Sequence, residues 1–323
     1  MNRREFLFGL GGTGFDVGTR GFKKSLLYRM FFGHIDGDQD KEKLKAPKEV
    51  VIPPSLMLHS KHAKLENLIP FLDLIQANGY KAVTYSEWLQ SVENGQPIEK
   101  PIFISCDDLT LVNGNSNIVV FRKFKDEFVR RGMRATFAVI TQPVMLNVDG
   151  TTTLLDEQDE EKWDEIVTWV SDGMELATHS SHHTTLNGQN TLPNPNLDDE
   201  DYTQEIDNSV ALIEAQLLQR GITYSVKTFI TPFGSGYSYQ QPNHVIHQQV
   251  VDHCKQSGLK IVVGIVEGRT PVKTSGLKQS NNTVTYVGRV GPAEDDGGLD
   301  PQRTLGYMNQ WNDANDSFEE SMS

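Results

Sequence analysis

Two adjacent carboxylates, Asp107 and Asp108, end an apolar run that begins at Pro101. Side chains alternate between the two faces of a strand, so neighbouring aspartates can share one site only where the regular pleat stops. We therefore expect the pair at the end of a strand. In parallel α/β folds, ligands bind and catalytic residues gather at the carboxyl ends of the strands. Asp107 and Asp108 are thus the first candidates for chemistry.

Three histidines, His179, His182 and His183, follow a second apolar run at residues 174–178. Histidines three or four residues apart on a helical turn can present two ring nitrogens to one metal ion. Taken alone, such a cluster is also compatible with hydrogen-bonded turn residues. Two histidines and an aspartate from another strand end would hold a catalytic zinc or a similar divalent ion and leave a position open for water.

A third apolar run leads into the turn Thr231-Pro232-Phe233-Gly234. Backbone N–H groups held rigidly in such a turn can stabilise a developing oxyanion, because the donors are in place before the reaction. On its own, this stretch is better explained as a connecting loop. Arg289, at the end of a late apolar run, is a further candidate for a site residue, and a structural ion pair explains it equally well.

Apolar runs alternate with segments of helical periodicity from residue 50 onward, and glycine commonly ends the helical segments. Near-continuous apolar strands indicate a parallel sheet covered by helices. We predict an α/β fold, a distorted (β/α)7-type barrel, with an open doubly wound sheet as the alternative. The expected strands are 56–59, 82–84, 101–108, 135–140, 174–178, 226–230, 261–266 and 283–290. The expected helices are 65–78, 86–92 with Ser86 as its cap, 118–131, 163–171, 203–220 and 243–257.

The chain has 323 residues, enough for one barrel-sized domain with a substantial core. It carries 43 acidic and 30 basic side chains, a net charge of −13. This balance disfavours nucleic acid and anionic membranes as partners, because both require a cationic face. The apolar runs are too short to span a bilayer, and two cysteines make no disulfide framework.

The N-terminus has features of an export signal. Arg3 and Arg4 precede a glycine-rich apolar run that extends to Phe15, which is typical of a twin-arginine signal. We expect residues 1–45 to be an export-like segment with a linker, and residues 46–323 to be the catalytic domain with a surface C-terminal tail. The expected location is the periplasm or cell surface, with the cytoplasm as the alternative.

The three strand-end stretches together resemble the motifs of a known family. Ile104-Ser105-Cys106-Asp107-Asp108 resembles T-F-D-D, the stretch from Glu175 to His183 resembles E-I-G-x-H-[ST]-x-x-H, and Thr231-Pro232-Phe233-Gly234 resembles the end of R-x-P-[YF]-G. These are motifs of the polysaccharide deacetylases of carbohydrate esterase family four. Leu56-Met57-Leu58-His59 with Gly79-Tyr80 resembles the poly-N-acetylglucosamine deacetylase branch. The likeness covers about residues 50–290.

The resemblance implies that Asp108, His179 and His183 hold a divalent metal ion, with zinc expected, and that Asp107 is the general base. It also implies that the Phe233 N–H helps to stabilise the oxyanion. The implied partner is an acetylated oligo- or polysaccharide from which acetate is released, with an N-acetylated one favoured over an O-acetylated one. His182 remains an alternative to His183, because residues three apart also chelate.

Four departures from the family pattern motivate alternative hypotheses about the function. Cys106 stands where the family has phenylalanine, Ile230 stands where it has an arginine that orients the base, and the D-x-x-D-W and L-x-H-D segments are missing. The last of these normally supplies the general acid. The alternatives are a catalytically silent saccharide-binding protein on the same fold and a metallo-amidase for a non-sugar amide. Aromatic residues near the motifs are candidates to stack on sugars, although at helical spacing they are more often core residues: Trp163, Trp169, Tyr237 and Tyr239.

Overall fold

The computed structural model describes the chain from residue 52 to residue 310, with gaps at 61–64, 112–116, 143, 147–151, 155–158, 187–196, 241–242, 266–283, 290, 292–293 and 296–297. Only the backbone is described for 144–146, 152–154, 237–240, 243–245, 294–295 and 298. The expected export-like segment, residues 1–45, and the side chains of Tyr237 and Tyr239 therefore lie outside the described residues.

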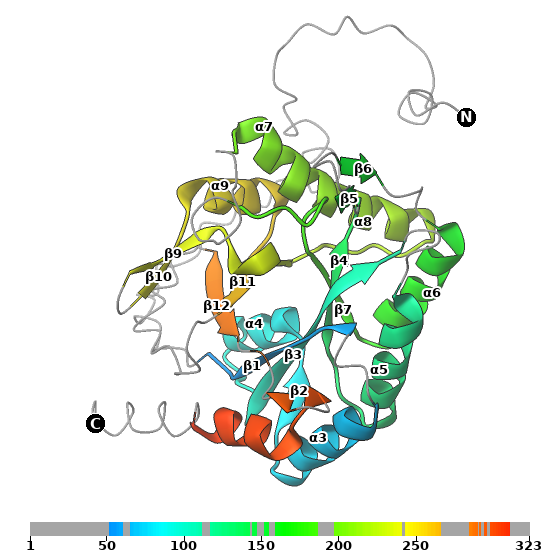
Figure 1. Cartoon of the computed structure of the whole chain (residues 1–323), viewed down its shortest axis with the longest axis vertical. Coiled ribbons are helices and arrows are strands. Elements are labelled where there is room, and N and C mark those ends of the chain that lie inside the picture. The colour runs from blue at the N-terminus through cyan, green and yellow to red at the C-terminus, as the bar shows by residue number, and fades with distance from the viewer. Residues whose placement is uncertain are drawn as a thin grey trace, which may run out of the picture. The chain divides into compact units, whose positions relative to one another are not determined.

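A parallel sheet forms the centre of the described structure (Figure 1). Its path runs through β1 (Ser55–Leu58), β3 (Pro101–Thr110), β4 (Thr136–Ile140), β7 (Glu175–Thr178), β8 (Thr228–Ile230), β11 (Ile261–Ile265) and β12 (Thr285–Arg289). A further strand, β2 (Lys81–Val83), pairs with the beginning of β3. The last strand of the path lies beside the first, so the sheet nearly closes. This confirms the distorted (β/α)7-type barrel and excludes the open sheet.

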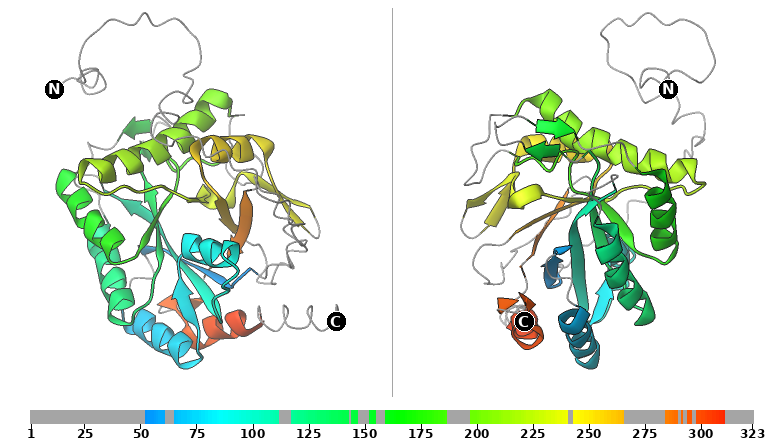
Figure 2. Two further views of the ribbon diagram at one scale, coloured as in Figure 1. Left: turned by 180° about the vertical axis from the view of Figure 1, so that it is seen from behind. Right: turned by 45° about the vertical axis from the view of Figure 1, so that its right-hand side comes forward.

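Helices cover the outside of the sheet, as expected for parallel strands that are buried on both faces (Figure 2). They are α3 (Leu65–Ala77), α4 (Tyr85–Glu93), α5 (Ile118–Arg130), α6 (Glu160–Ser171), α8 (Asn208–Gln219) and α9 (Gln248–Ser257). The inner face of α5 contributes Phe121 and Phe128, whose rings pack edge-on against Phe137 of β4. Trp163 and Trp169 of α6 are fully buried in this core, so neither can stack on a sugar.

Alternate strand residues fill a second, smaller cluster inside the barrel. Phe103, Ala177 and Val287 belong to it, whereas the next residues along β3 and β7, Ile104 and Leu176, belong to the larger cluster under the helices. This alternation is the two-residue period of a strand. Two residues beyond each of these three inward-facing residues, on the same side of the strand, the chain has a polar side chain instead of an apolar one. The inward-facing side chains of the strands therefore form a polar site at the carboxyl end of the barrel.

Several helices begin at other places than the sequence predicts, and α6 does so by three residues, at Glu160. The helix expected to begin at Ser86 begins at Tyr85 and is capped by Thr84, whose Oγ1 accepts a hydrogen bond from the Glu87 N–H at 3.1 Å. The helix expected over 243–257 begins only at Gln248, because β9 (Tyr237–Gln240) and β10 (Asn243–Ile246) form an antiparallel hairpin. Local periodicity did not separate a strand from a helical start here.

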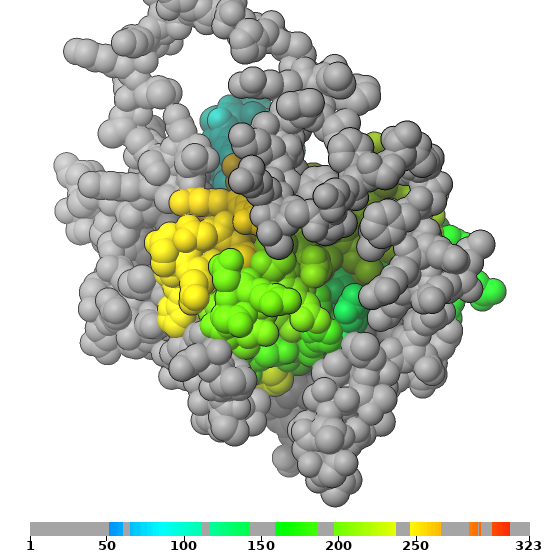
Figure 3. Space-filling view, turned by 90° about the horizontal axis from the view of Figure 1, so that it is seen from above, coloured from blue at the N-terminus to red at the C-terminus, as the bar shows by residue number. Residues whose placement is uncertain are grey.

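The helix expected over 203–220 is part of a longer helical run. It begins with α7 (Asp199–Tyr202), continues through a π-helical turn, η2 (Thr203–Asp207), and ends with α8. Asp198 caps it through the N–H groups of Glu200 and Asp201. Figure 3, viewed onto this end of the molecule, shows the yellow helix α9 lying beside the green α7–α8 run.

The short pieces are β5 (Val144–Leu146) with β6 (Thr152–Leu154), the 3₁₀ turn η3 (Pro232–Gly234), and β13 (Glu294–Asp295) with β14 (Gly298–Leu299). Residues 301–310 form a helix with Leu305 and Met308 buried. The Tyr80 hydroxyl donates a hydrogen bond to Asn309 at 2.9 Å, which joins this helix to the start of β2. Among the described helices, none has the length and apolar character needed to cross a bilayer.

Candidate metal centre

Asp107 and Asp108 lie within β3 rather than at its end, so the expected position of the pair is wrong by two residues. The pairing of β3 with β4 shifts in register between Cys106 and Leu109, and then resumes with Leu109 opposite Val139. Asp108 has a φ of 64° at this bulge. The left-handed residue turns the chain so that both carboxylates reach one site, which a regular pleat would prevent.

Asp108 meets two histidines from the segment that follows β7. Its Oδ1 lies 3.2 Å from His179 Nε2 and 3.2 Å from His183 Nε2. One ligand atom from each of the three residues lies within 4.8 Å of the other two. Burial alone would raise the pKa of Asp108, but the two neighbouring histidines hold it well below its usual value. The structure therefore brings the three expected metal ligands together.

The ring of His179 is oriented by the strand beside it. Its Nδ1 lies 2.7 Å from the carbonyl oxygen of Ile230. A carbonyl can only accept, so Nδ1 carries the proton, and Nε2 of the neutral ring presents a lone pair to Asp108. A neutral ring in this tautomer is arranged as a metal ligand would be, with Nε2 3.2 Å from the Asp108 oxygen.

The spacing of the donors suits a divalent metal ion. Ligand atoms that lie about 2.0–2.2 Å from one tetrahedral ion are separated from each other by about 3.4 Å. The two nitrogen-to-oxygen separations in this cluster are 3.2 Å. Two imidazoles and one carboxylate are also a donor set that zinc favours, with a fourth position left for water. The residues present thus fit the metal that the sequence predicts.

His183, and not His182, completes this cluster. Ser180 and His183 both have positive φ, 67° and 59°, so the segment is no regular helical turn. The His183 N–H donates to Ser180 Oγ at 2.9 Å, and its ring lies 4.8 Å from that of His179. His182 turns away and binds Glu205, with 2.7 Å between Nδ1 and Oε1.

Asp107 is buried beside the three ligands and is paired with Arg289. The Arg289 Nη1 donates to Asp107 Oδ1 at 2.5 Å and to Ser105 Oγ at 2.8 Å. Burial would raise the pKa of Asp107, but the Arg289 guanidinium and His179 lower it below its usual value. The other carboxylate oxygen, Oδ2, lies 3.9 Å from His179 Nε2. An ionised carboxylate thus borders the metal ligands.

Phe233 lies at the rim of the site, in the turn η3. Its φ is 53°, its side chain is exposed, and its ring centroid is 4.4 Å from that of His183. Ser235 fixes the turn, because its Oγ donates to the Pro232 carbonyl at 2.7 Å and accepts from the Leu186 N–H at 2.8 Å. The turn is therefore tied to the segment that carries the histidines.

Comparisons with known proteins agree with this geometry. A family model described as "Polysaccharide deacetylase" matches residues 94–260, just over half of the chain. The chain belongs to the polysaccharide deacetylase family. It is therefore a hydrolase of carbon–nitrogen bonds other than peptide bonds. No curated protein sequence matches the chain significantly.

Two solved structures share the fold of this deacetylase. The deacetylase PplD of Streptococcus pyogenes, solved in complex with acetate, is 16% identical and has a TM-score of 0.52, with 81% of this chain and 99% of that chain covered. A de-N-acetylase from Aggregatibacter actinomycetemcomitans is 18% identical and has a TM-score of 0.52, with 79% and 99% covered. At these identities the likeness concerns the fold.

His59 is a site residue of the deacetylase that sequence reasoning did not select. It directly follows β1, and its Nε2 lies 3.8 Å from Asp108 Oδ2. Its side chain is 26% exposed, so solvent can reach it. A signal was present, because His59 is a polar residue at the carboxyl end of an apolar strand, as His179 is.

Cys106 of the deacetylase takes no part in the metal site. It is fully buried and belongs to the core cluster under the helices, on the opposite face of β3 from Asp107. Burial raises the pKa of its thiol well above the usual value. A thiol in this state is neither a good nucleophile nor a metal ligand. Cys106 is therefore an inert core residue.

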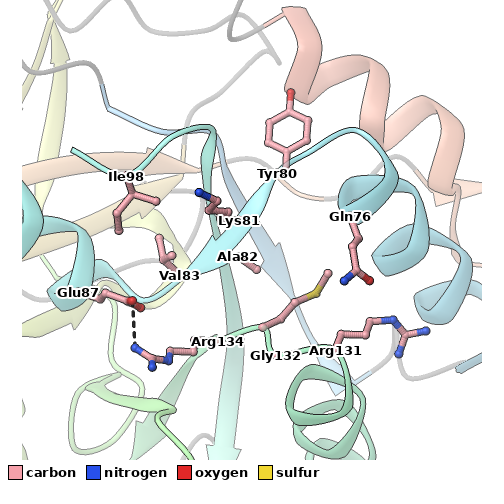
Figure 4. Close-up of a pocket in the computed structure, with 11 residues that line it drawn as sticks. Gln76, Tyr80, Lys81, Ala82, Val83, Glu87, Ile98, Arg131, Gly132 and Arg134 are labelled. Carbon is pink, nitrogen blue, oxygen red and sulfur yellow. Dashed lines mark ion pairs between the residues drawn. The ribbon is translucent and has the colours of Figure 1, made fainter. Parts of the chain in front are cut away.

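A pocket of about 340 Å³ lies at the other end of the barrel, where β2 begins and where the chain enters β4 (Figure 4). Lys81, Arg131 and Arg134 line it, but the two arginines are already paired. Arg134 lies 3.0 Å from Glu87, and Arg131 binds Asp73 and Glu127. None of the metal ligands lines this pocket, so it is separate from the active site of the deacetylase.

Proposed function

We propose that this deacetylase removes acetyl groups from an N-acetylated saccharide, with an O-acetylated one less favoured, in a reaction that requires a divalent metal ion. We propose zinc as the ion. The observation that carries the proposal is the cluster of Asp108, His179 and His183 next to the ionised Asp107. Family membership supports it, as do two solved relatives in fold, a de-N-acetylase and a deacetylase with bound acetate.

The proposed roles of the protein side chains follow from their positions. A divalent ion held by the three ligands would polarise the acetyl carbonyl and lower the pKa of the attacking water. Asp107 would accept the proton of that water, because Arg289 keeps the carboxylate ionised and engages only Oδ1. The Phe233 N–H, in its rigid turn, would donate to the developing oxyanion.

The leaving amine needs a proton, and we propose His59 as its source. His59 approaches Asp108 from the Oδ2 side, whereas the two histidine ligands contact Oδ1. A general acid at this position would lie beside the metal site. Such proton transfer typically contributes about 10²–10⁴-fold to a rate. The missing L-x-H-D segment would then be replaced by a residue from the first strand.

Metal content and acetate release, measured on the same preparations, test this function. Wild-type protein should contain about one divalent ion per chain, and a chelator should abolish acetate release from chitooligosaccharide. Asp108→Ala should lose the ion, because it removes the shared ligand. Asp107→Asn should keep the ion and lose about 10²–10⁴-fold in kcat. Undiminished turnover after complete metal removal would contradict the proposal.

The silent saccharide-binding alternative was motivated by a missing arginine and a missing acid. Arg289 contacts Asp107 from another strand, and His59 lies beside Asp108, so that motive is weakened. Binding of chitooligosaccharide without turnover by metal-loaded protein would favour the silent protein. Turnover of simple amides in preference to acetylated sugars would favour the metallo-amidase.

A further inference from the structure

Glu205 holds the chain on both sides of the ligand His183. Its carboxylate accepts the His182 N–H at 3.0 Å through Oε2, and the Thr184 hydroxyl at 3.2 Å through Oε1. The His182 ring adds a third contact, with 2.7 Å between its Nδ1 and Oε1. One side chain therefore fixes both residues that flank His183 in the sequence.

The same part of the helix also holds the beginning of this segment through its backbone. The Ser181 N–H donates to the Glu205 carbonyl at 3.0 Å, and Ser181 Oγ donates to the Gln204 carbonyl at 2.6 Å. Residues 181, 182 and 184 are thus hydrogen-bonded to helical residues 204–205, and residue 183 lies between two of these anchored residues. Glu205 itself is buried, with 5% of its surface exposed.

These contacts come from the π-helical turn η2 (Thr203–Asp207). In this turn the Asn208 N–H bonds the Thr203 carbonyl, five residues back rather than four. A π turn holds more residues than an α turn and rotates the following side chains around the axis, and such turns are frequent at functional sites. Here the wide turn directs both the backbone and the carboxylate of Glu205 toward the histidine segment.

We infer that Glu205 is a positioning residue of the metal site, which keeps His183 facing Asp108 and His179 and keeps His182 away from the metal. The inference rests on the proposed metal site. His183 and Ser180 both have left-handed backbone, which non-glycine residues keep only when their surroundings impose it. Glu205 supplies this restraint without touching the metal ligands themselves.

Zinc affinity of the metal-free full-length protein tests the inference without any activity assay. The protein is titrated with Zn²⁺ in competition with a chromophoric chelator. Glu205→Ala should weaken zinc binding about 10–100-fold, the usual cost of removing a residue that orients a metal ligand. Glu205→Gln retains one acceptor oxygen and should show an intermediate loss, as should Thr184→Val, which removes one of the three contacts.

Glu175→Ala is the matched control. Glu175 is also a buried glutamate with several hydrogen bonds, but it lies at the opposite end of β7 from the histidines. The Glu175→Ala variant should have lower thermal stability, but its zinc affinity should stay within about two-fold of wild type. Unchanged zinc affinity in both Glu205 variants, or an equal loss in Glu175→Ala, would overturn the positioning role.

His182→Ala separates positioning from ligation. It leaves the His182 N–H in place, so it should weaken zinc binding less than Glu205→Ala, and adding it to Glu205→Ala should cause no further loss. Complete loss of zinc in His182→Ala would make His182 a ligand and overturn the inference. Wild-type protein that binds no zinc would instead contradict the proposed function. Wild-type protein that binds zinc and releases acetate, with Glu205→Ala equally tight, would contradict the positioning role alone.

Discussion

Four side chains around the proposed metal site stand on left-handed backbone: Asp108, Ser180, His183 and Phe233, with φ between 53° and 67°. Each such residue costs about 1–3 kcal/mol and persists only where its surroundings impose the conformation. The cost is offset here by specific contacts, such as the Ser180 Oγ that accepts from the His183 N–H. At the scale of single residues, the site therefore depends on neighbours that enforce unfavourable backbone.

Arg289 and Asp107 form a fully buried ion pair, so removal of one partner leaves a charge without compensation. We expect Arg289→Met to lower the free energy of unfolding by about 3–5 kcal/mol, and Arg289→Lys to lower it less. Urea denaturation measures both. The double variant Arg289→Met with Asp107→Asn should regain part of the loss, because no isolated charge remains. A double variant that is less stable than Arg289→Met would contradict this account.

Glu175 predicts a pH dependence of stability. Burial raises its pKa above the ordinary value of 4.5, although hydrogen bonds from Thr228, Thr136 and Ser86 oppose the rise. The folded state therefore keeps the proton to higher pH than the unfolded state does. Its contribution to stability is complete below pH 4.5 and is lost as pH rises through the raised pKa.

Glu175→Gln cannot lose a proton, so it should gain stability relative to wild type as pH rises above 4.5. Unfolding free energies of both proteins, measured by urea denaturation from pH 4 to pH 8, give this difference directly. Other titrating groups are the same in the two proteins and cancel. A difference that does not change with pH would show that Glu175 titrates alike in both states.

At the scale of elements, the two-residue period of the strands decides which side chains reach the site. On β3 the inward row passes from Phe103 through Ser105 to Asp107, and on β12 it passes from Val287 to Arg289. Apolar members fill the barrel, and the polar members at its carboxyl end form the site. Two irregularities contribute further residues. The bulge in β3 brings Asp108 to the site, and the π turn directs Glu205 toward the histidine segment.

Gly236 connects the η3 turn to β9 and tests how tightly these elements pack. It has a φ of 81°, and a Cβ there would lie 3.2 Å from carbons of both Leu186 and Val250. Gly258, which ends α9, has a φ of 77° but open space around it. Alanine at either position costs about 1 kcal/mol for the backbone alone.

Gly236→Ala should be less stable than Gly258→Ala by a further 1–3 kcal/mol or so, because it also displaces packed side chains. Urea denaturation of the two variants gives the comparison, with Gly258→Ala as the control for backbone strain. Gly236→Ala should also reduce kcat, since the turn bears Phe233. Equal stability of the two variants would mean that Leu186 and Val250 yield without cost.

At the scale of the whole molecule, the parallel barrel gathers residues that are far apart in the sequence. Asp107 and Arg289 are separated by 182 residues, and Asp108 and His179 by 71, yet each pair is in contact. Because all ladders of the main sheet are parallel, every carboxyl end lies at the same end of the barrel. The site is therefore assembled from β1, β3, β7, η3 and β12.

Export of the whole chain remains a prediction from Arg3 and Arg4. We expect Arg3→Lys with Arg4→Lys to reduce export of the full-length protein several-fold, because a twin-arginine signal is recognised through that pair. Cell fractionation with acetate release as the readout measures it, and the purified variant should keep wild-type activity. Equal amounts of both proteins outside the cytoplasm would remove the basis for the prediction.

The sequence by itself determined the fold class and most of the chemistry. Its strand and helix periods are local patterns, and Asp107, Asp108 and His179 directly follow recognisable apolar runs. Tertiary structure alone decided between His182 and His183, placed Arg289 on Asp107, brought His59 to Asp108, and revealed Glu205. The reason is physical: spacing along the chain specifies local geometry, whereas these contacts depend on the closure of a barrel, a bulge and a π turn that no local period encodes.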